Sequence, residues 1–252
     1  MTDKNDDIDW GPEIDAQFMR QASWTEMFRN QIYRRINLLG AKKILDVGCG
    51  TGVITREIRE KCSAKISAID NDPNMIKLAK KRVSKVDFVV ENAEQLSAKS
   101  ETFDIVLFHY LMLWLNNPEL VVKEMARVCK KKGYVVALAE PDYGGWVEHP
   151  DFNLGKKHVE YLQREGADPC IGRKIQALFE SAGLETEISI IAQAWDKESL
   201  RDNIEEEWRR VLEADLISEA EFKQKLQLEK ESIAKNQRLI FIPVFTAIGR
   251  KK

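Results

Sequence analysis

Three glycines at alternate positions follow a short apolar segment, and their spacing is typical of a ligand-binding loop. The segment 44–47 contains Asp46, and Gly48, Gly50 and Gly52 come directly after it. Glycines placed in this way let the backbone turn sharply and let a ligand lie against it. A helix that begins after the loop would offer free N–H groups to an anionic end of that ligand. The pattern therefore predicts a site for a nucleoside-bearing cofactor.

Two classes of cofactor loop place glycines here. A dinucleotide loop, G-x-G-x-x-G, needs its third glycine at position 53, where this chain has Val53. The stretch instead resembles the E/D-x-G-x-G-x-G loop, which is the first motif of the class I S-adenosylmethionine-dependent methyltransferases. The resemblance implies S-adenosyl-L-methionine as cofactor, with Asp46, Gly48, Gly50 and Gly52 in its site.

A second segment resembles the same family in the expected order. Asp70 ends the next apolar run, where a carboxylate can accept hydrogen bonds from both ribose hydroxyls of a nucleoside. Asp72 precedes Pro73 and is explained as a helix cap, whereas Asp70 has no such local use. The resemblance implies that Met75 or Asn71 lies against the adenine.

A third segment is similar to the part of the family's site beside the adenine amino group. It contains Asn92 and Ala93, and Asn92 stands where an aspartate is more usual, which keeps an acceptor and removes a charge. The next apolar run ends at His109, whose backbone carbonyl we expect to accept a hydrogen bond from the donor's amino group. The motifs together cover residues 40 to about 190.

Catalytic residues are harder to predict, because the sulfonium of the donor already activates its methyl group. The protein mainly aligns the acceptor and excludes water, and it needs a base only if the acceptor keeps its proton until attack. His109 is one candidate base, although we favour its backbone role. Tyr143 is the other polar candidate, because the turn that contains it is expected to overhang the pocket.

The methyl acceptor is predicted to be a small molecule, and the resemblance is to the small-molecule methyltransferases similar to those of quinone biosynthesis. The [DNS]-P-P-[YFW] signature of amino-methyltransferases of nucleic acids is absent after His109, and Pro169-Cys170 is interpreted as a turn. The 39 basic residues are nearly cancelled by 41 acidic ones, so we expect no DNA partner and disfavour RNA. Two alternatives stay open: methylation of a protein or RNA, and a non-catalytic scaffold that binds S-adenosylmethionine.

The elements that must position these residues follow an α/β pattern. Short apolar runs alternate with amphipathic helical segments, which predicts a Rossmann-like, seven-stranded, mostly parallel sheet with helices on both faces. The predicted strands are 43–47, 65–69, 86–90, 103–108, 134–139, 185–191 and 239–248, and the last strand is expected to be antiparallel. Helices are predicted after Pro73 and Pro118, at 156–164 and 171–182, and from the capping box of Ser218 and Glu221.

We expect a single methyltransferase domain over residues 1–252. It divides into an N-terminal helical cap (1–40), a cofactor-binding half (41–141), and helical insertions (142–170 and 196–236) that form the substrate side. The acceptor is expected to lie between these insertions and four residues of the cap: Trp10, Phe18, Arg20 and Trp24. The helix after Pro118 is expected to end at Lys130, Lys131, Lys132 and Gly133, with cations near its carbonyl end and a glycine cap.

Composition argues against a membrane-spanning, metal-binding or disulfide-stabilised protein. No apolar run is long enough to cross a bilayer about 30 Å thick, and the N-terminal sequence is acidic and polar, so we expect a cytoplasmic protein. The four cysteines are scattered, with no CxxC pair and no histidine at metal-ligand spacing. Neither a metal site nor a disulfide framework is predicted.

Overall fold

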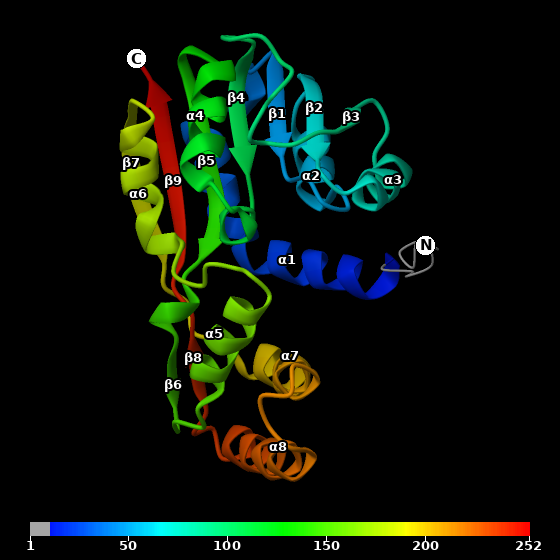
Figure 1. Ribbon diagram of the computed structural model, residues 1–252, viewed down its shortest axis with the longest axis vertical. Coiled ribbons are helices and arrows are strands. Elements are labelled where there is room, and N and C mark those ends of the chain that lie inside the picture. Colours follow the sequence, from blue (N-terminus) through cyan, green and yellow to red (C-terminus); the bar gives the residue numbers. More distant parts are fainter. Residues whose placement is uncertain (1–10) are drawn as a thin grey trace, which may run out of the picture.

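A seven-stranded sheet forms the centre of the molecule in the computed structural model, which describes residues 11–252 (Figure 1). Its strands are β1 (Lys43–Val47), β2 (Lys65–Asp70), β3 (Asp87–Val90), β4 (Phe103–Phe108), β5 (Cys129–Pro141), β7 (Leu184–Ile191) and β9 (Val244–Lys251). Their order in the sheet is β3-β2-β1-β4-β5-β9-β7. The last strand, β9, runs antiparallel to both β5 and β7, whereas β1 to β5 pair in parallel. The predicted Rossmann-like fold is confirmed.

Helices cover both faces of this sheet. They are α1 (Gly11–Arg35), α2 (Val53–Lys61) and α3 (Pro73–Arg82) on one face, and α4 (Pro118–Val128) and α6 (Ile175–Ser181) on the other. Alternate residues of β4 show the division, because Ile105 packs toward α1 and α2 while Val106 packs toward α4 and α6. The predicted caps are present: Asp72 accepts from the N–H of Asn74, and Asn117 accepts from the N–H of Leu120.

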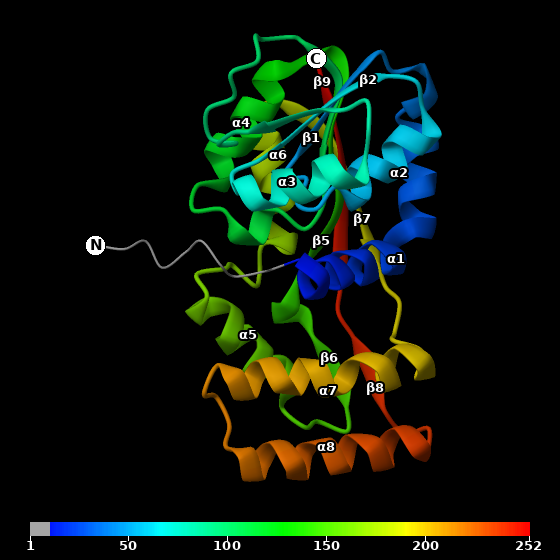
Figure 2. The ribbon, with the colours of Figure 1, turned by 90° about the vertical axis from the view of Figure 1, so that its right-hand side faces the viewer.

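A second layer lies beyond the carboxyl edge of the parallel strands. It contains α5 (Leu154–Arg164), α7 (Lys197–Glu213), α8 (Glu219–Ala234), and the antiparallel pair β6 (Val147–His149) and β8 (Leu239–Phe241). Leu154, Ile204, Trp208 and Phe222 belong to a hydrophobic cluster separate from those of the sheet. Helix α1 runs between the sheet and this layer, and α7 and α8 lie one beyond the other (Figure 2).

The end of α4 differs from the sequence prediction. The helix ends at Val128, and the residues from Lys130 to Gly133 belong to β5. Gly133 makes a close approach to β4, because a Cβ atom there would lie 2.7 Å from the carbonyl oxygen of Asp104, and Lys130 forms an ion pair with the Asp104 side chain at 2.6 Å. These long-range contacts extend the strand.

The insertions also differ in detail from the prediction. The predicted strand 239–248 is two strands, β8 and β9, with Pro243 between them, and β8 pairs with β6 rather than with the main sheet. Proline has no N–H for a strand ladder, which explains the break. The insertions are therefore not wholly helical. Their helices agree with the pattern, and Ser218 and Glu221 form the predicted capping box.

Candidate functional site

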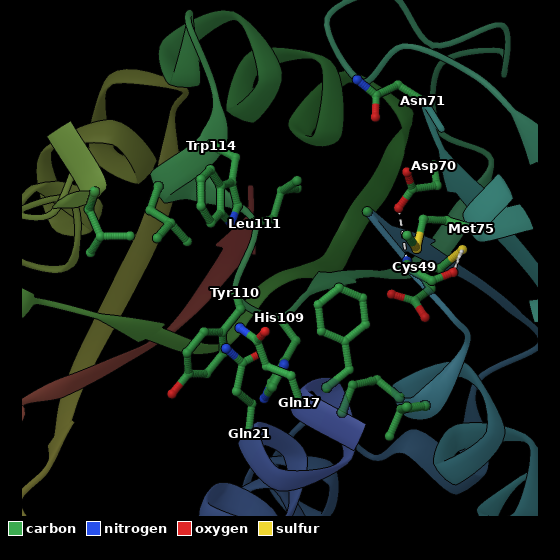
Figure 3. A pocket seen from close by; sticks show the side chains of 18 of the residues that line it. Gln17, Gln21, Cys49, Asp70, Asn71, Met75, His109, Tyr110, Leu111 and Trp114 are labelled. Carbon is green, nitrogen blue, oxygen red and sulfur yellow. Dashed lines mark hydrogen bonds between the residues drawn. The ribbon is translucent and has the colours of Figure 1, made fainter. Parts of the chain in front are cut away.

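A cavity of about 310 Å³ lies at the carboxyl edge of the parallel strands, between the sheet, α1 and the inserted layer (Figure 3). Strand ends that point the same way bring their following loops together at this edge. Of the residues predicted from the sequence, the cavity wall contains Asp46, Gly48, Gly50, Asp70, Asn71, Met75, His109 and Tyr143. The structure therefore gathers most of the predicted cofactor residues around one space.

Three predicted cofactor residues lie outside the cavity wall. A Cβ atom on Gly52 would lie 3.1 Å from the Cβ of Ala79, so this glycine lets α2 pack closely on α3. Asn92 is exposed and accepts a hydrogen bond from the N–H of Glu94, and Ala93 follows it in the same loop. Trp10, which was predicted to line the acceptor side, lies outside the described residues.

The glycine loop adopts the backbone conformation that its composition permits. Gly48, Gly50 and Gly52 have φ angles of +68°, +51° and +80°. A Cβ on Gly50 would lie 2.7 Å from the ring of Phe18 on α1, so this residue combines a left-handed backbone with a close approach. The loop leads into α2, whose first residues follow Gly52.

Asp70 links the ends of β1 and β2. Its Oδ2 accepts from the N–H of Gly50 at 2.8 Å, and its Oδ1 accepts from the N–H of Asp72 at 3.0 Å (Figure 3 shows the first bond). The expectation that Asp70 has no local use is therefore wrong, because it shapes the loop. Each carboxylate oxygen has a second acceptor site, and the side chain still faces the cavity.

Asp46 is a buried carboxyl group beneath the same loop. It is 1% exposed and accepts a hydrogen bond from the Thr55 hydroxyl at 2.5 Å. Burial raises the pKa of Asp46 to about 7. The hydrogen bond from Thr55 lowers this pKa, whereas the nearby charge of Asp70 raises it. Burial also raises the pKa of Asp70 above its ordinary value. A ligand with hydroxyl donors would favour the ionised form of Asp70.

The loop after β4 is held by a buried glutamate. Both carboxylate oxygens of Glu140 on β5 accept backbone N–H groups, from Leu111 at 2.8 Å and from Met112 at 3.0 Å. Tyr110 beside them has a φ of +55°. Glu140 is fully buried, and burial raises its pKa to about 8. Its role here is to position the loop that carries His109 and Tyr110.

His109 faces the cavity but has a partner on α1. Its Nε2 lies 3.2 Å from the hydroxyl of Thr25, which also accepts from the guanidinium of Arg29 at 2.5 Å. Burial, together with the Arg29 charge, holds the pKa of His109 well below its usual range. The Thr25 hydroxyl also lies 3.5 Å from the carbonyl oxygen of Gln21, so its single proton has two acceptors within reach. The lowered pKa makes the His109 ring a poor proton acceptor.

Helix α1 forms one wall of the cavity through Gln17, Phe18 and Gln21 (Figure 3). It is attached to α2 by a buried ion pair in which Arg29 donates to Glu57 at 2.5 Å. Arg29 also donates to the carbonyl of Ala22 within its own helix at 2.6 Å. The N-terminal helix is therefore fixed over the glycine loop by charge as well as by packing.

The opposite wall comes from the inserted layer, and the sequence reasoning missed most of it. Besides Tyr143, the cavity is lined there by His158 and Tyr161 of α5 and by Arg210 of α7. The rings of Tyr143 and His158 lie 4.9 Å apart between centroids, and those of His158 and Tyr161 lie 5.7 Å apart. No motif marks these residues, because each belongs to an ordinary amphipathic helix.

Two smaller cavities adjoin the first and share Tyr143 with it. One, of about 80 Å³, has a mainly aromatic and aliphatic wall that includes Trp24, Tyr110 and Trp195. The other, of about 20 Å³, combines charged and polar side chains, among them Arg20, Asn203, Glu207 and Arg210, with aromatic ones such as Trp24 and Trp195. Tyr143 therefore stands where the cavity beside the glycine loop, an apolar compartment and a mixed polar and apolar compartment meet.

The charges of the inserted wall neutralise one another. Glu206 pairs with Arg20 at 2.9 Å and with Arg210 at 2.6 Å, and Arg210 also lies 3.6 Å from Glu207. Within residues 11–252, no cluster of three or more His, Cys, Asp or Glu side chains could hold a metal ion. Within the same residues, no helix combines the length and apolar character that crossing a membrane requires.

Comparisons with known proteins agree with this architecture. A family model described as a methyltransferase domain matches residues 45–137. An uncharacterized methyltransferase of Schizosaccharomyces pombe is 35% identical over 127 residues, which are 48% of this chain and 48% of that protein. The demethylmenaquinone methyltransferase of Lysinibacillus sphaericus is 30% identical over 178 residues, which are 63% of this chain and 76% of the relative. The chain thus spans about half the length of the first relative and three quarters of the second.

Among solved structures, one from Bacillus halodurans, provisionally named a methyltransferase, superimposes with a TM-score of 0.62 at 20% identity. The match covers 88% of this chain and 98% of that one, and at this identity it supports the fold alone. The sheet order, the glycine loop after β1 and the sequence relatives point to one conclusion. The chain belongs to the class I S-adenosylmethionine-dependent methyltransferase family.

Proposed function

We propose that this protein transfers the methyl group of S-adenosyl-L-methionine to a small-molecule acceptor. The observation that carries the proposal is the shared cavity, because the glycine loop and Asp70 lie on one side of it and Tyr143, His158 and Arg210 lie on the other. A donor held on the sheet side would face an acceptor held on the inserted side. This arrangement is what a direct transfer between two bound molecules requires.

The donor half of the cavity fits the cofactor of the family. Asp70 would accept hydrogen bonds from the ribose hydroxyls, and Asn71 and Met75 would lie beside the adenine. The backbone around Gly48 and Gly50, at the start of α2, would receive the anionic carboxylate end. Asn92 and Ala93 remain proposed contacts at the outer, adenine end, where the ligand would have to extend beyond the cavity wall.

The main role of the protein in this reaction would be to align the acceptor with the methyl group of the donor. The sulfonium of the bound donor supplies an activated methyl group, so no metal ion has to take part. The side chains around the cavity hold the acceptor in line and exclude water, and Phe18, Tyr110 and Trp114 are placed in its wall to do so. His109 would contribute its backbone carbonyl rather than its ring.

Three features support a small acceptor over a macromolecule. The cavity volume lies in the range of small-molecule sites, which is roughly 300–1,000 Å³. Helix α1 and the inserted layer stand over the site (Figure 1). The relative from Lysinibacillus sphaericus is named for a small quinone-type substrate. We accordingly propose that residues 41–141 form the cofactor half and that 1–40, 142–170 and 196–236 form the substrate side.

Calorimetry with S-adenosyl-L-methionine tests the donor site. Asp70→Ala should abolish detectable binding, because it removes the ribose acceptor and the partner of the Gly50 N–H. Asp87→Ala, at an exposed carboxylate on β3, is the matched control and should bind as the unmodified protein does. Unchanged affinity in Asp70→Ala would rule out the assigned site.

The acceptor is sought with a donor that carries an isotopically labelled methyl group. The protein is incubated with this donor and a metabolite extract, and the label is followed by mass spectrometry. Label in small molecules supports the proposal, while label in protein or RNA fractions favours the macromolecular alternative. Tight donor binding with no transfer to any fraction would favour the non-catalytic scaffold.

A further inference from the structure

His158 combines burial, a neighbouring carboxylate and access to the cavity. It lies on α5, is 2% exposed, and belongs to the same cavity wall as Tyr143 and Asp70. Its Nδ1 lies 3.3 Å from Oε2 of Glu207, which comes from α7. The packing of α5 on α7 around Leu154, Ile204 and Trp208 brings the two side chains together. The contact is therefore built by the core of the inserted layer.

The hydrogen bonds of this histidine are incomplete. Nδ1 is buried and close to Glu207 but not aligned with it as a hydrogen bond, and Nε2 makes no hydrogen bond to the residues that the structure describes. A small rotation of the ring would let Nδ1–H donate to Glu207. In that tautomer Nε2 carries a lone pair, and it is the nitrogen left to accept a proton.

Burial, more than the surrounding charges, keeps the ring neutral. Tyr143 on the loop after β5, Tyr161 on α5, and Glu207 and Arg210 on α7 are the titratable or charged groups around it. Burial lowers the pKa of His158, Glu207 acts against this effect, and Arg210 adds to it. A histidine held neutral near pH 7 is in the form that can take up a proton.

The other polar groups of the wall are less suited to that role. Nε2 of His109 lies 3.2 Å from the Thr25 hydroxyl, and burial together with the Arg29 charge holds the pKa of this ring well below its usual range. Burial raises the pKa of the Tyr143 hydroxyl above its ordinary value, so it stays protonated and cannot accept a proton as a phenolate. Glu207 itself faces Arg210 as well as His158. Among the described residues of the cavity wall, His158 has the most available basic atom.

We infer that His158 is the general base of the transfer, that Glu207 is its positioning residue, and that the acceptor is an uncharged planar molecule bearing a hydroxyl group. The inference rests on the proposed methyl transfer. As the acceptor oxygen bonds to the methyl carbon, the S–C bond breaks, its electron pair stays on sulfur, and the hydroxyl proton passes to Nε2. Proton loss from the ring to solvent completes the cycle.

The class of acceptor follows from what lines the adjoining space. The compartment beside Tyr143 is walled by Trp24, Tyr110 and Trp195, and Trp24 and Trp195 lie 5.5 Å apart between ring centroids. Aromatic walls favour planar apolar groups. The charges of Arg20, Glu206 and Arg210 are already paired, so an ionic acceptor would have to displace existing partners.

Nuclear magnetic resonance of labelled histidine tests the geometry without any substrate. The chain has three histidines, so each imidazole can be assigned by substitution. We expect His158 to be neutral at pH 7 with its proton on Nδ1, which is the less common tautomer in water. Glu207→Ala should shift it toward the Nε2–H form, whereas Glu205→Ala on the same helix should not. An Nε2–H tautomer in the unmodified protein would overturn the inference.

Activity toward two phenols tests the proton transfer. At about pH 8.5, 4-nitrophenol is largely ionised, whereas phenol, like the tyrosine side chain with its pKa of about 10, is not, so only phenol needs a base. His158→Gln should lose roughly 100-fold or more in kcat with phenol and much less with 4-nitrophenol. His149→Gln, at an exposed histidine on β6, should match the unmodified protein. Equal losses with both phenols would assign His158 a structural role and overturn the inference.

Donor binding separates this inference from the proposed function. S-adenosyl-L-methionine affinity and melting temperature are measured for every variant, and both should be close to the unmodified values in His158→Gln. If the unmodified protein fails to bind the donor, the proposed function fails. If it binds the donor and transfers methyl groups to extract compounds but to neither phenol, the inferred acceptor class is wrong. His158→Phe, which keeps a planar ring without a base, should also lose activity with phenol as His158→Gln does.

Discussion

Gly50 donates its backbone N–H to the carboxylate of Asp70 at 2.8 Å, which joins the loop after β1 to the end of β2. The bond makes the two halves of the proposed donor site interdependent. A change in the loop conformation would move the side chain proposed to bind ribose, and a change at Asp70 would release the loop. The first prediction concerns this link.

Gly50→Ala should weaken donor binding at least about 10-fold and lower the free energy of unfolding by roughly 1–3 kcal/mol. The added methyl group meets a φ of +51° and the ring of Phe18 at 2.7 Å. Gly166→Ala is the control, because Gly166 has a φ of +81° with nothing within 4 Å of a Cβ. Calorimetry and chemical unfolding measure both effects. An equal loss of donor affinity and of unfolding free energy in both variants would mean that the contact between Gly50 and Phe18 of α1 contributes to neither.

The buried carboxyl groups should make stability depend on pH. The folded pKa values of Asp46 and Glu140 are about 7 and about 8, above ordinary values near 4. Their contribution to stability is therefore complete below about pH 4 and is lost as the pH rises through about 8.

Asp46→Asn should remove part of this dependence. The free energy of unfolding of the unmodified protein, minus that of the variant, should fall by a few kcal/mol, about 1.4 per unit of pKa shift, between pH 5 and pH 8. Denaturant titrations at several pH values measure the difference. Glu119→Gln, at an exposed position of α4, should show no such trend. A difference that rises with pH would contradict the raised pKa.

The attachment of α1 should depend on one buried ion pair. Arg29→Met leaves Glu57 without its partner and should lower the free energy of unfolding by about 3 kcal/mol. Arg35→Met removes an exposed pair with Glu187 and should cost under about 1 kcal/mol. Hydrogen exchange should show faster exchange in α1 of the first variant. Protection equal to that of the unmodified protein would argue that packing alone holds the helix.

Removal of one buried ion pair should destabilise the inserted layer without loss of the proposed donor site. Glu229 and Arg238 form a fully buried pair at 2.6 Å, and Glu229 also accepts from Trp208 at 3.0 Å. Glu229→Ala should cost about 3 kcal/mol or more in the stability of this layer. Donor affinity should stay within about 2-fold, because the proposed donor residues lie at the edge of the main sheet and not in this layer. Glu231→Ala, at an exposed position of α8, is the control. If Glu229→Ala lost donor binding together with stability, the inserted layer and the main sheet would unfold as one unit.

The sequence by itself determined the features that rest on local chemistry. The alternating glycines permit the positive φ angles of the loop. Asp72 and Asn117 cap their helices by accepting from the N–H groups two and three residues further along the chain. Strand and helix periodicity predicted the main sheet, because burial on one or both faces leaves a regular pattern. Parallel strands then bring their ends together, so Asp70 and His109 were placed at the same edge.

Tertiary structure alone decided the inserted side of the cavity, which we propose binds the acceptor. His158 and Glu207 are adjacent because α5 packs on α7, and neither helix carries a signal that names its partner. The same holds for β6 with β8 and for Lys130 with Asp104, where long-range pairing overrode the local pattern. Asp70 was predicted from its position, but its bond to Gly50 depends on how β1 and β2 pair. Contacts between distant segments depend on the packing of whole elements, and local periodicity does not record which elements meet.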